Sequence, residues 1–128
     1  MSLNNQANRQ SGMGPRAEAL ASISEAVSIY RKLAEGNADA FLPHLARSQC
    51  VLGNCLEGME RLSEARDAVA ESLGVLAPFF SQYPGVFDGL AGVTCRDYLL
   101  RSEKLKVEPT VEVLAPYMRL FDEGESHD

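Results

Sequence analysis

The side chains able to do chemistry are few in this chain: its cysteines are Cys50, Cys55 and Cys95, and its histidines are His44 and His127. Metal binding requires several such ligands to converge, and a thiol nucleophile requires a base within hydrogen-bond reach. On a helix, Cys50 and Cys55 would lie about 140° apart, and His44 and Cys50 about 120° apart and nearly two turns along the axis. The spacing therefore favours free, buried thiols, and we expect no metal site and no cofactor.

Other signatures of catalysis are incomplete. Gly53 and Gly58 have the four-residue gap of a phosphate-binding loop, but Met59 and Glu60 follow where that loop needs Lys and then Ser or Thr. No motif singles out a carboxylate for acid or base chemistry, and Glu57 with Arg61 has the i, i+4 spacing of an ordinary helix pair. A small hydrolase-type enzyme is the least favoured function.

Composition narrows the class of partner. Twelve Lys and Arg are scattered among eighteen Asp and Glu, giving a net charge of −6, which argues against nucleic-acid binding. No apolar run approaches the roughly 18 to 20 residues needed to span a bilayer, and the polar start of the chain lacks the basic and apolar regions of a signal peptide. We therefore expect a cytoplasmic protein with no membrane partner.

The elements that would position any site are helices. Apolar residues recur at three- and four-residue steps, which predicts helices that each bury one face, and no segment keeps the two-residue alternation of a half-buried strand. The stripes are Leu20, Ile23, Val27, Tyr30 and Ala34; Leu45, Leu52, Leu56 and Met59; Leu62, Ala65, Val69, Leu76 and Phe80; Phe87, Leu90, Thr94, Tyr98 and Leu105; and Val111, Leu114, Met118 and Phe121.

Turns separate these segments at regular intervals. Pro15, Pro84 and Pro109 each stand where a helix could begin, because the first helical residue does not need its N–H. Connections this short require antiparallel neighbours. The turns are at Gly14–Pro15, Gly36–Asp39, Gly58–Glu60, Tyr83–Gly85 and Val107–Pro109.

The helical pattern also repeats. Shifting the chain by 46 residues aligns identical residues in two stretches, so the unit is a helix pair and the chain holds about two and a half units, expected to stack as a solenoid. The aligned pairs include Ser2 with Ser48, Asn8 with Asn54, Gly12 with Gly58, Met13 with Met59, Glu18 with Glu64, Ala19 with Ala65, Glu25 with Glu71 and Phe41 with Phe87.

The segment from Cys50 to Ala65 resembles the tetratricopeptide repeat. Leu52 and Gly53 match the large and small residues of that family's first helix, and Ala65, Val69 and Ser72 match the contact face of its second. Ser2–Asn5, Glu18–Leu20, Ile29–Arg31 and Asp39–Pro43 look like the long bacterial variety, and Leu76–Phe79, Arg96–Leu99 and Leu114–Tyr117 are similar to the divergent end of such arrays. The resemblance implies an all-α right-handed superhelix of antiparallel helix pairs, about six helices in all.

Departures from the family pattern mark the two ends of a single domain, residues 1–128. Gln6 and Gln10 stand where the family has Leu, so 1–14 is expected to be a polar N-terminal helix or cap, followed by regular repeats over 15–82, a divergent C-terminal cap over 84–122 and a frayed tail over 123–128. Glu60 replaces the usual glycine of the turn within a pair. Pro78 and Pro116 predict helix kinks near Ala77 and Ala115.

The resemblance also implies where a partner binds, because the first helix of each pair lines the concave face in this repeat class. Two asparagines recur there, and an amide can donate to and accept from a peptide backbone, while two arginines could meet an acidic group. The predicted groove residues are Asn4, Asn8, Arg47, Cys50, Asn54, Glu57, Arg96 and Leu100, with Ser11 and Glu103 beside them.

The function that these features imply is a non-catalytic scaffold or adaptor that binds a protein or peptide. The resemblance also implies that such an array is often one part of a larger regulatory protein. The alternative is an end-cap fragment of a longer array that associates with itself, for which a homodimer is the simplest product.

Overall fold

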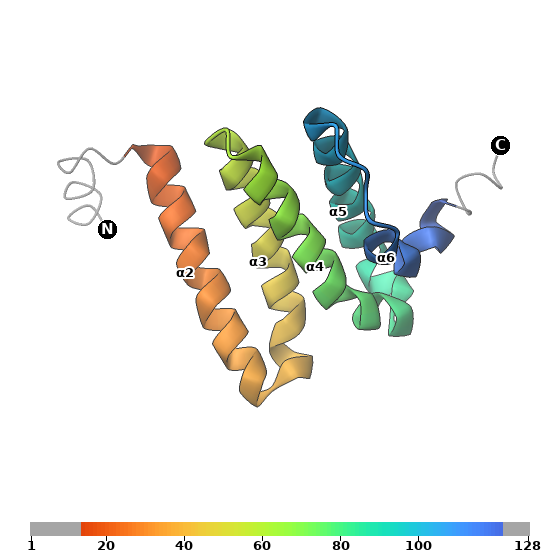
Figure 1. Ribbon diagram of the computed structural model, residues 1–128. Coiled ribbons are helices and arrows are strands. Elements are labelled where there is room, and N and C mark those ends of the chain that lie inside the picture. Colours follow the sequence, from red (N-terminus) through yellow and green to blue (C-terminus); the bar gives the residue numbers. More distant parts are fainter. Residues whose placement is uncertain (1–13, 122–128) are drawn as a thin grey trace.

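The computed structural model describes residues 14–121, and within them it contains helices and no strand. Four long helices follow one another across the molecule in chain order, each packed on the next (Figure 1). They are α2 (Pro15–Gly36), α3 (Ala38–Gly58), α4 (Leu62–Gln82) and α5 (Pro84–Leu105), followed by the short α6 (Val111–Leu114) and a 3-10 turn at Ala115–Tyr117. The all-α prediction is confirmed, whereas the predicted helix at 1–14 lies outside the described residues. None of the described helices combines the length and apolar character that crossing a membrane requires.

The helix bounds repeat with the period found in the sequence. The start of α3 at Ala38 and the start of α5 at Pro84 are 46 residues apart, and so are the ends of α2 at Gly36 and α4 at Gln82. A single residue joins each pair of helices, Asn37 between α2 and α3 and Tyr83 between α4 and α5. The repeating unit among the described residues is therefore a tight antiparallel hairpin of two helices.

Local chemistry explains where the helices begin. Pro15 and Pro84 occupy the first turns of α2 and α5 as predicted, and the Asn37 side chain caps α3 by accepting from the Ala40 N–H at 3.3 Å. The prediction for Pro109 was less accurate, because α6 begins at Val111, two residues after it. Pro43 lies inside α3 as its sixth residue.

The core lies mainly between α4 and its neighbours. Its largest fully buried members are Tyr98, Tyr117, Phe80, Leu73 and Leu76. α4 continues unbroken through Pro78 to Gln82. Gly53 of α3 lets the backbones approach, because a Cβ built there would come within 3.2 Å of the Ala65 carbonyl oxygen on α4. The large and small pair Leu52–Gly53 thus packs as the sequence pattern indicated.

The C-terminal segment differs from its predicted stripe. The α-helix changes to a 3-10 turn at Ala115–Tyr117, which contains Pro116 and lies where a kink was predicted. The turn changes which side chains face inward. Val111 and Met118 are exposed, whereas Tyr117 is fully buried, with its ring centroid 5.1 Å from that of Phe80. The Tyr117 hydroxyl donates to the Leu73 carbonyl. The prediction that Val111 and Met118 face the core was therefore wrong.

Arg66 fastens this segment to the long helices. Its Nε donates to Ser102 Oγ at 2.7 Å, its Nη2 donates to the Glu108 carbonyl at 3.0 Å, and its guanidinium lies 4.8 Å from the centroid of the Tyr98 ring. The Tyr98 hydroxyl in turn accepts from the Thr110 N–H at 2.8 Å. The loop after α5 is thereby held against α4 and α5.

Glu60 lies in the turn between α3 and α4. Its φ is 62°, the left-handed region that favours glycine, and its backbone closes the α3–α4 turn. Glu60→Gly is expected to stabilise the fold by about 1 kcal/mol, because the native conformation is strained for any residue with a Cβ. The free energy of unfolding from urea titration would measure the gain. Glu60→Ala is the control and should give no such gain; a destabilised glycine variant would contradict the explanation.

Candidate partner-binding face

The helices α3 and α5, which are the second helices of the two described hairpins, run side by side and parallel (Figure 1). Polar contacts join them at two levels along the helices: Cys50 Sγ lies 3.0 Å from Thr94 Oγ1, and Arg101 Nε lies 2.7 Å from Glu57 Oε1. Both pairs are 44 residues apart in sequence. The two contacts lie seven residues, or about two helical turns, apart along each helix. Residues of α3 and α5 that differ by 44 in number therefore lie at the same level.

Arg101 dominates the contact between α3 and α5. Its side chain is buried, Nε donates to Glu57, and Nη2 donates to Asn54 Oδ1 at 2.9 Å. Lys104 Nζ contacts the second carboxylate oxygen of Glu57 at 2.9 Å. Two of the predicted groove residues, Asn54 and Glu57, thus use these side-chain oxygens to hold the fold together.

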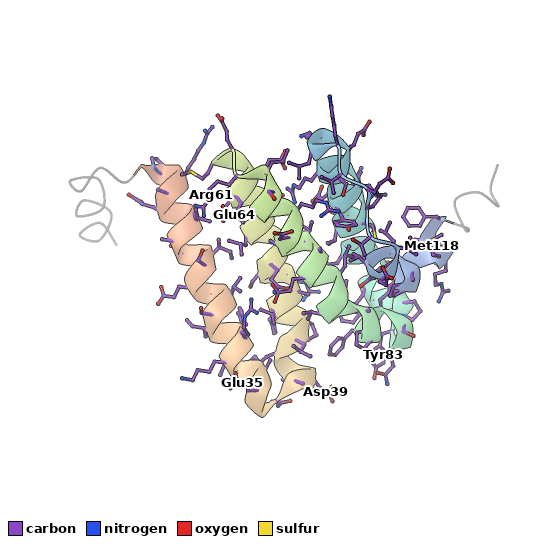
Figure 2. The ribbon with its side chains drawn as sticks, in the orientation of Figure 1. Glu35, Asp39, Arg61, Glu64, Tyr83 and Met118 are labelled. Carbon is purple, nitrogen blue, oxygen red and sulfur yellow. The ribbon has the colours of Figure 1, made fainter. Side chains whose placement is uncertain are left out.

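The ion pairs change the electrostatics of Glu57. Hydrogen bonds from Lys104 and then from Arg101 lower the pKa of its carboxyl below 4.5, against an opposing effect of burial. The predicted i, i+4 pair of Glu57 with Arg61 was wrong: Arg61 instead binds Glu64, with Nη2 2.6 Å from Oε1 (Figure 2). Arg101 on α5 is buried, whereas Arg61 in the turn after α3 is exposed. Water therefore screens the pair of Glu57 with Arg101 less than it would screen a pair with Arg61.

Cys50 belongs to a small polar cluster between three helices. The Ser72 hydroxyl donates to the Ala46 carbonyl at 2.8 Å, and the Thr94 hydroxyl donates to the Leu90 carbonyl at 2.7 Å. Each hydroxyl has one proton, so the Cys50 thiol, 3.0 Å from Thr94 Oγ1, is the donor of its own contact. The half-buried Cys50 thiol is therefore engaged in a contact between helices.

The surface that stays open combines charge and apolar side chains. Arg47 and Val51 project from α3, and Val93, Arg96 and Leu100 project from α5; all five are exposed. By the offset of 44, Val51 stands level with Cys95, between Val93 and Arg96 along the neighbouring helix. We call these five residues the α3–α5 face. Only Arg47, Arg96 and Leu100 of it were predicted.

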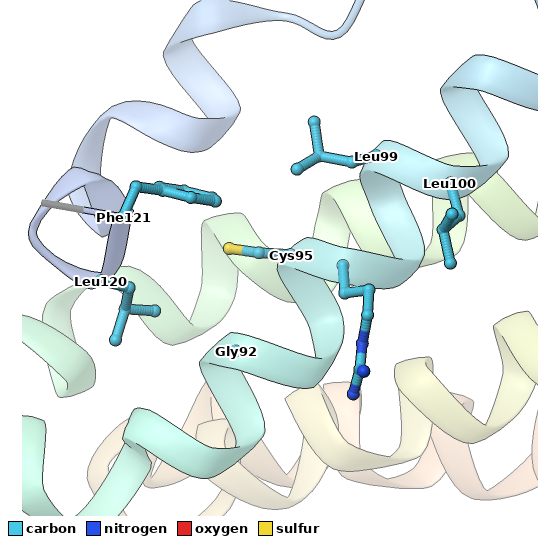
Figure 3. A pocket seen from close by; sticks show the side chains of 7 residues that line it. Gly92, Cys95, Leu99, Leu100, Leu120 and Phe121 are labelled. Atoms are coloured by element: carbon cyan, nitrogen blue, oxygen red, sulfur yellow. The ribbon is translucent and has the colours of Figure 1, made fainter. Parts of the chain in front are cut away.

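A pocket of about 390 Å³ opens beside this face, between α5 and the C-terminal segment. Arg96 and Leu100 line it together with Cys95, Leu99 and Phe121, and Figure 3 shows Leu120 and Phe121 across the opening from α5. Burial raises the pKa of the Cys95 thiol to about 11, so this sulfur stays protonated near neutral pH. The pocket is thus an apolar hollow with one arginine at its edge.

The other residues that the sequence singled out are Asn4, Asn8, Ser11, Glu103 and His44. Asn4, Asn8 and Ser11 lie outside the described residues, and Glu103 is exposed near the end of α5. His44 is exposed and stacks on Tyr30, with ring centroids 5.3 Å apart. Within residues 14–121, no three His, Cys, Asp or Glu side chains come together as a metal site would need.

Arg101 is the important residue that sequence reasoning missed. The fourth stripe runs Phe87, Leu90, Thr94, Tyr98 and Leu105, and a step of three from Tyr98 falls on Arg101. The gap in this stripe was the available signal: an arginine at a core position requires a buried partner. Nothing local identifies that partner, because Glu57 is 44 residues away.

No protein-family model, no curated protein and no solved structure matches this chain.

Proposed function

We propose that this protein is a non-catalytic scaffold that binds a peptide segment of another protein across the α3–α5 face. The observation that supports this most directly is that apolar and positively charged side chains are exposed together on this face. Val51, Val93 and Leu100 offer apolar contact, and Arg47 and Arg96 flank them. Arginine and apolar side chains in one patch are typical of protein-binding surfaces. The tetratricopeptide-like pattern of the sequence points to the same use.

The pocket beside the face adds an anchoring position. It is large enough to bury a bulky side chain of the partner, and burial of such a side chain supplies most of the affinity of a short peptide. Arg96 at its edge can form a charge-assisted hydrogen bond with an acidic group of the same partner. We therefore place the main contact at Arg96 and Leu100.

The α3 half of the face contributes less than the sequence indicated. The Asn54 amide oxygen is occupied by Arg101, and the Glu57 carboxylate by Arg101 and Lys104. Arg47 and Val51 remain available on this helix. An Asn54→Ala change would test the stability of the Arg101 contact, and it is therefore a poor probe of binding.

Selection of a random dodecapeptide library on the full-length chain would test the proposal. Enriched peptides should bind with affinity that falls roughly ten-fold or more in Val51→Glu and in Val93→Glu, because each change places a charge in an apolar contact. Fluorescence anisotropy measures the affinity. Ile29→Glu, on α2 and equally exposed, is the matched control and should bind as the unaltered chain does.

Two results would count against this function. Failure of the library to enrich any peptide would show that the chain does not present a peptide site, and binding that survives both valine substitutions would place the site elsewhere. Both variants should retain the helical circular dichroism of the parent chain, since their positions are exposed.

A further inference from the structure

Within residues 14–121, no helix covers the side of α2 that corresponds to the α3-facing side of α4. Shifting α4 back by 46 residues places Ala65, Ala68 and Ser72 on Ala19, Ser22 and Ala26. The three α4 residues are buried, and Ser72 donates to the Ala46 carbonyl of α3. Of their α2 counterparts, Ala19 and Ser22 are exposed and Ala26 is half-buried.

Large apolar side chains continue this uncovered side. Val75 and Phe79 of α4 correspond to Ile29 and Leu33, which are 50% and 42% exposed although both are apolar. The extensive helix contact of α2 within residues 14–121 is with α3, and the buried α2 residues Val27 and Ala34 lie about 100° or more round the helix from Ile29 and Leu33. We call Ala19, Ser22, Ala26, Ile29 and Leu33 the outer α2 face.

We propose that the outer α2 face is a homodimer interface, in which α2 of a second copy of this chain packs antiparallel about a two-fold axis beside Ala26. Small residues occupy the first half of this face and large residues the second half. An antiparallel partner centred at Ala26 sets Leu33 level with the partner's Ala19, and Ile29 within one residue of the level of the partner's Ser22. The face is therefore complementary to itself, as a two-fold interface requires.

Charges along the edge of the face fit the same arrangement. Glu18, Glu25 and Lys32 follow one another at seven-residue steps, so they share one edge of α2. The two-fold places Lys32 within two residues, about 3 Å along the axis, of the level of the partner's Glu18. Glu25 is the one unfavourable charge in this row, because the two-fold places it beside Glu25 of the second copy.

The chain's own N-terminal residues are a weaker candidate for this position. The 46-residue shift would turn Leu3, Gln6, Ala7 and Gln10 toward α2, since they correspond to Gln49, Leu52, Gly53 and Leu56 of α3. Two of these four residues are glutamines, which suit the small and polar residues in the first half of α2. They offer no apolar contact to Ile29 and Leu33 in its second half. A second α2 supplies both kinds of contact.

Light scattering coupled to gel filtration on the full-length chain tests the dimer. The expected mass at high concentration is twice the chain mass of 13.9 kDa, and Ile29→Glu or Leu33→Glu should weaken dimerisation roughly ten-fold or more. Val93→Glu, at a comparable exposure on the α3–α5 face, is the control and should dimerise normally. Glu25→Gln should strengthen the dimer, because it removes the repulsion beside the axis.

A cysteine at the axis tests the geometry. Ala26→Cys should form a disulfide with its own copy under mild oxidation, whereas Ala19→Cys should do so only when mixed with Leu33→Cys. A strictly monomeric chain, or a dimer that survives Ile29→Glu and is lost in Val93→Glu, would overturn the proposal, and so would self-crosslinking of Ala19→Cys alone. These outcomes are independent of peptide binding at the α3–α5 face.

Discussion

Arg101→Ala is expected to lower the free energy of unfolding by about 3 kcal/mol, the largest effect that we predict for a single side chain. The Arg101 side chain is 4% exposed and joins α5 to Glu57 and Asn54 of α3. Its removal leaves a cavity beside Gly53 and withdraws one of the two cations from Glu57. Urea titration followed by circular dichroism measures the change.

Lys104→Ala is the matched control for this prediction. Lys104 binds the same carboxylate but is 56% exposed, so its removal should cost less than about 1 kcal/mol. Equal effects of the two changes would show that Arg101 acts only as a surface charge. Substitution of both members of the buried pair, Arg101→Met with Glu57→Gln, should recover much of the loss, because no uncompensated charge remains.

The pH dependence of stability supplies a second measure of the same contact. The pKa of Glu57 is lowered in the folded chain by Lys104 and Arg101, so the contribution of this group is present above its ordinary pKa of 4.5 and is lost as the pH falls through the lower folded value. Arg101→Ala should reduce this loss on the acid side. Glu57→Gln should abolish it.

Gly53→Ala is expected to destabilise the chain by about 2 kcal/mol. The added Cβ would lie 3.0 Å from Arg101 Nη1, 3.1 Å from Val69 Cγ1 and 3.2 Å from the Ala65 carbonyl oxygen. The carbonyl is part of the α4 backbone and cannot move without shifting that helix. The loss should appear as a lower urea midpoint with an unchanged slope.

Gly74→Ala is the opposite case. Gly74 also lies within a helix, but nothing stands within 4 Å of a Cβ built there, so alanine should stabilise α4 by about 0.5 to 1 kcal/mol through its higher helix propensity. The two glycine variants should therefore move the midpoint in opposite directions. A shift of the same sign in both would refute the packing role assigned to Gly53.

The elements were predictable where local chemistry decides them. Pro15 and Pro84 mark helix starts because the first helical residue does not need its N–H, and the turn predicted at Gly58–Glu60 separates α3 from α4. The period of 46 residues reappears in the bounds of the helices because equivalent sequences form equivalent hairpins. The last stripe failed because the 3-10 turn at Pro116 changes the inward phase, which apolar spacing does not reveal.

The site was harder to predict because its contacts join distant residues. Glu57 has a correctly spaced arginine at Arg61, yet it binds Arg101 on a neighbouring helix, where burial strengthens the pair. Asn54 and Cys50 looked available on one helix and are engaged by residues of others. Which polar groups remain open depends on helix packing, and that packing is not encoded in the spacing of any single segment.

The one-residue connections at Asn37 and Tyr83 bear on how the chain folds. Each long helix packs on the helix next to it in sequence, and the α3–α4 connection is also short. Contacts of this kind keep the sequence separation between touching residues small, which is typical of domains that fold in microseconds to milliseconds. Ordering can start in either hairpin and propagate to its neighbour across the α3–α4 contact.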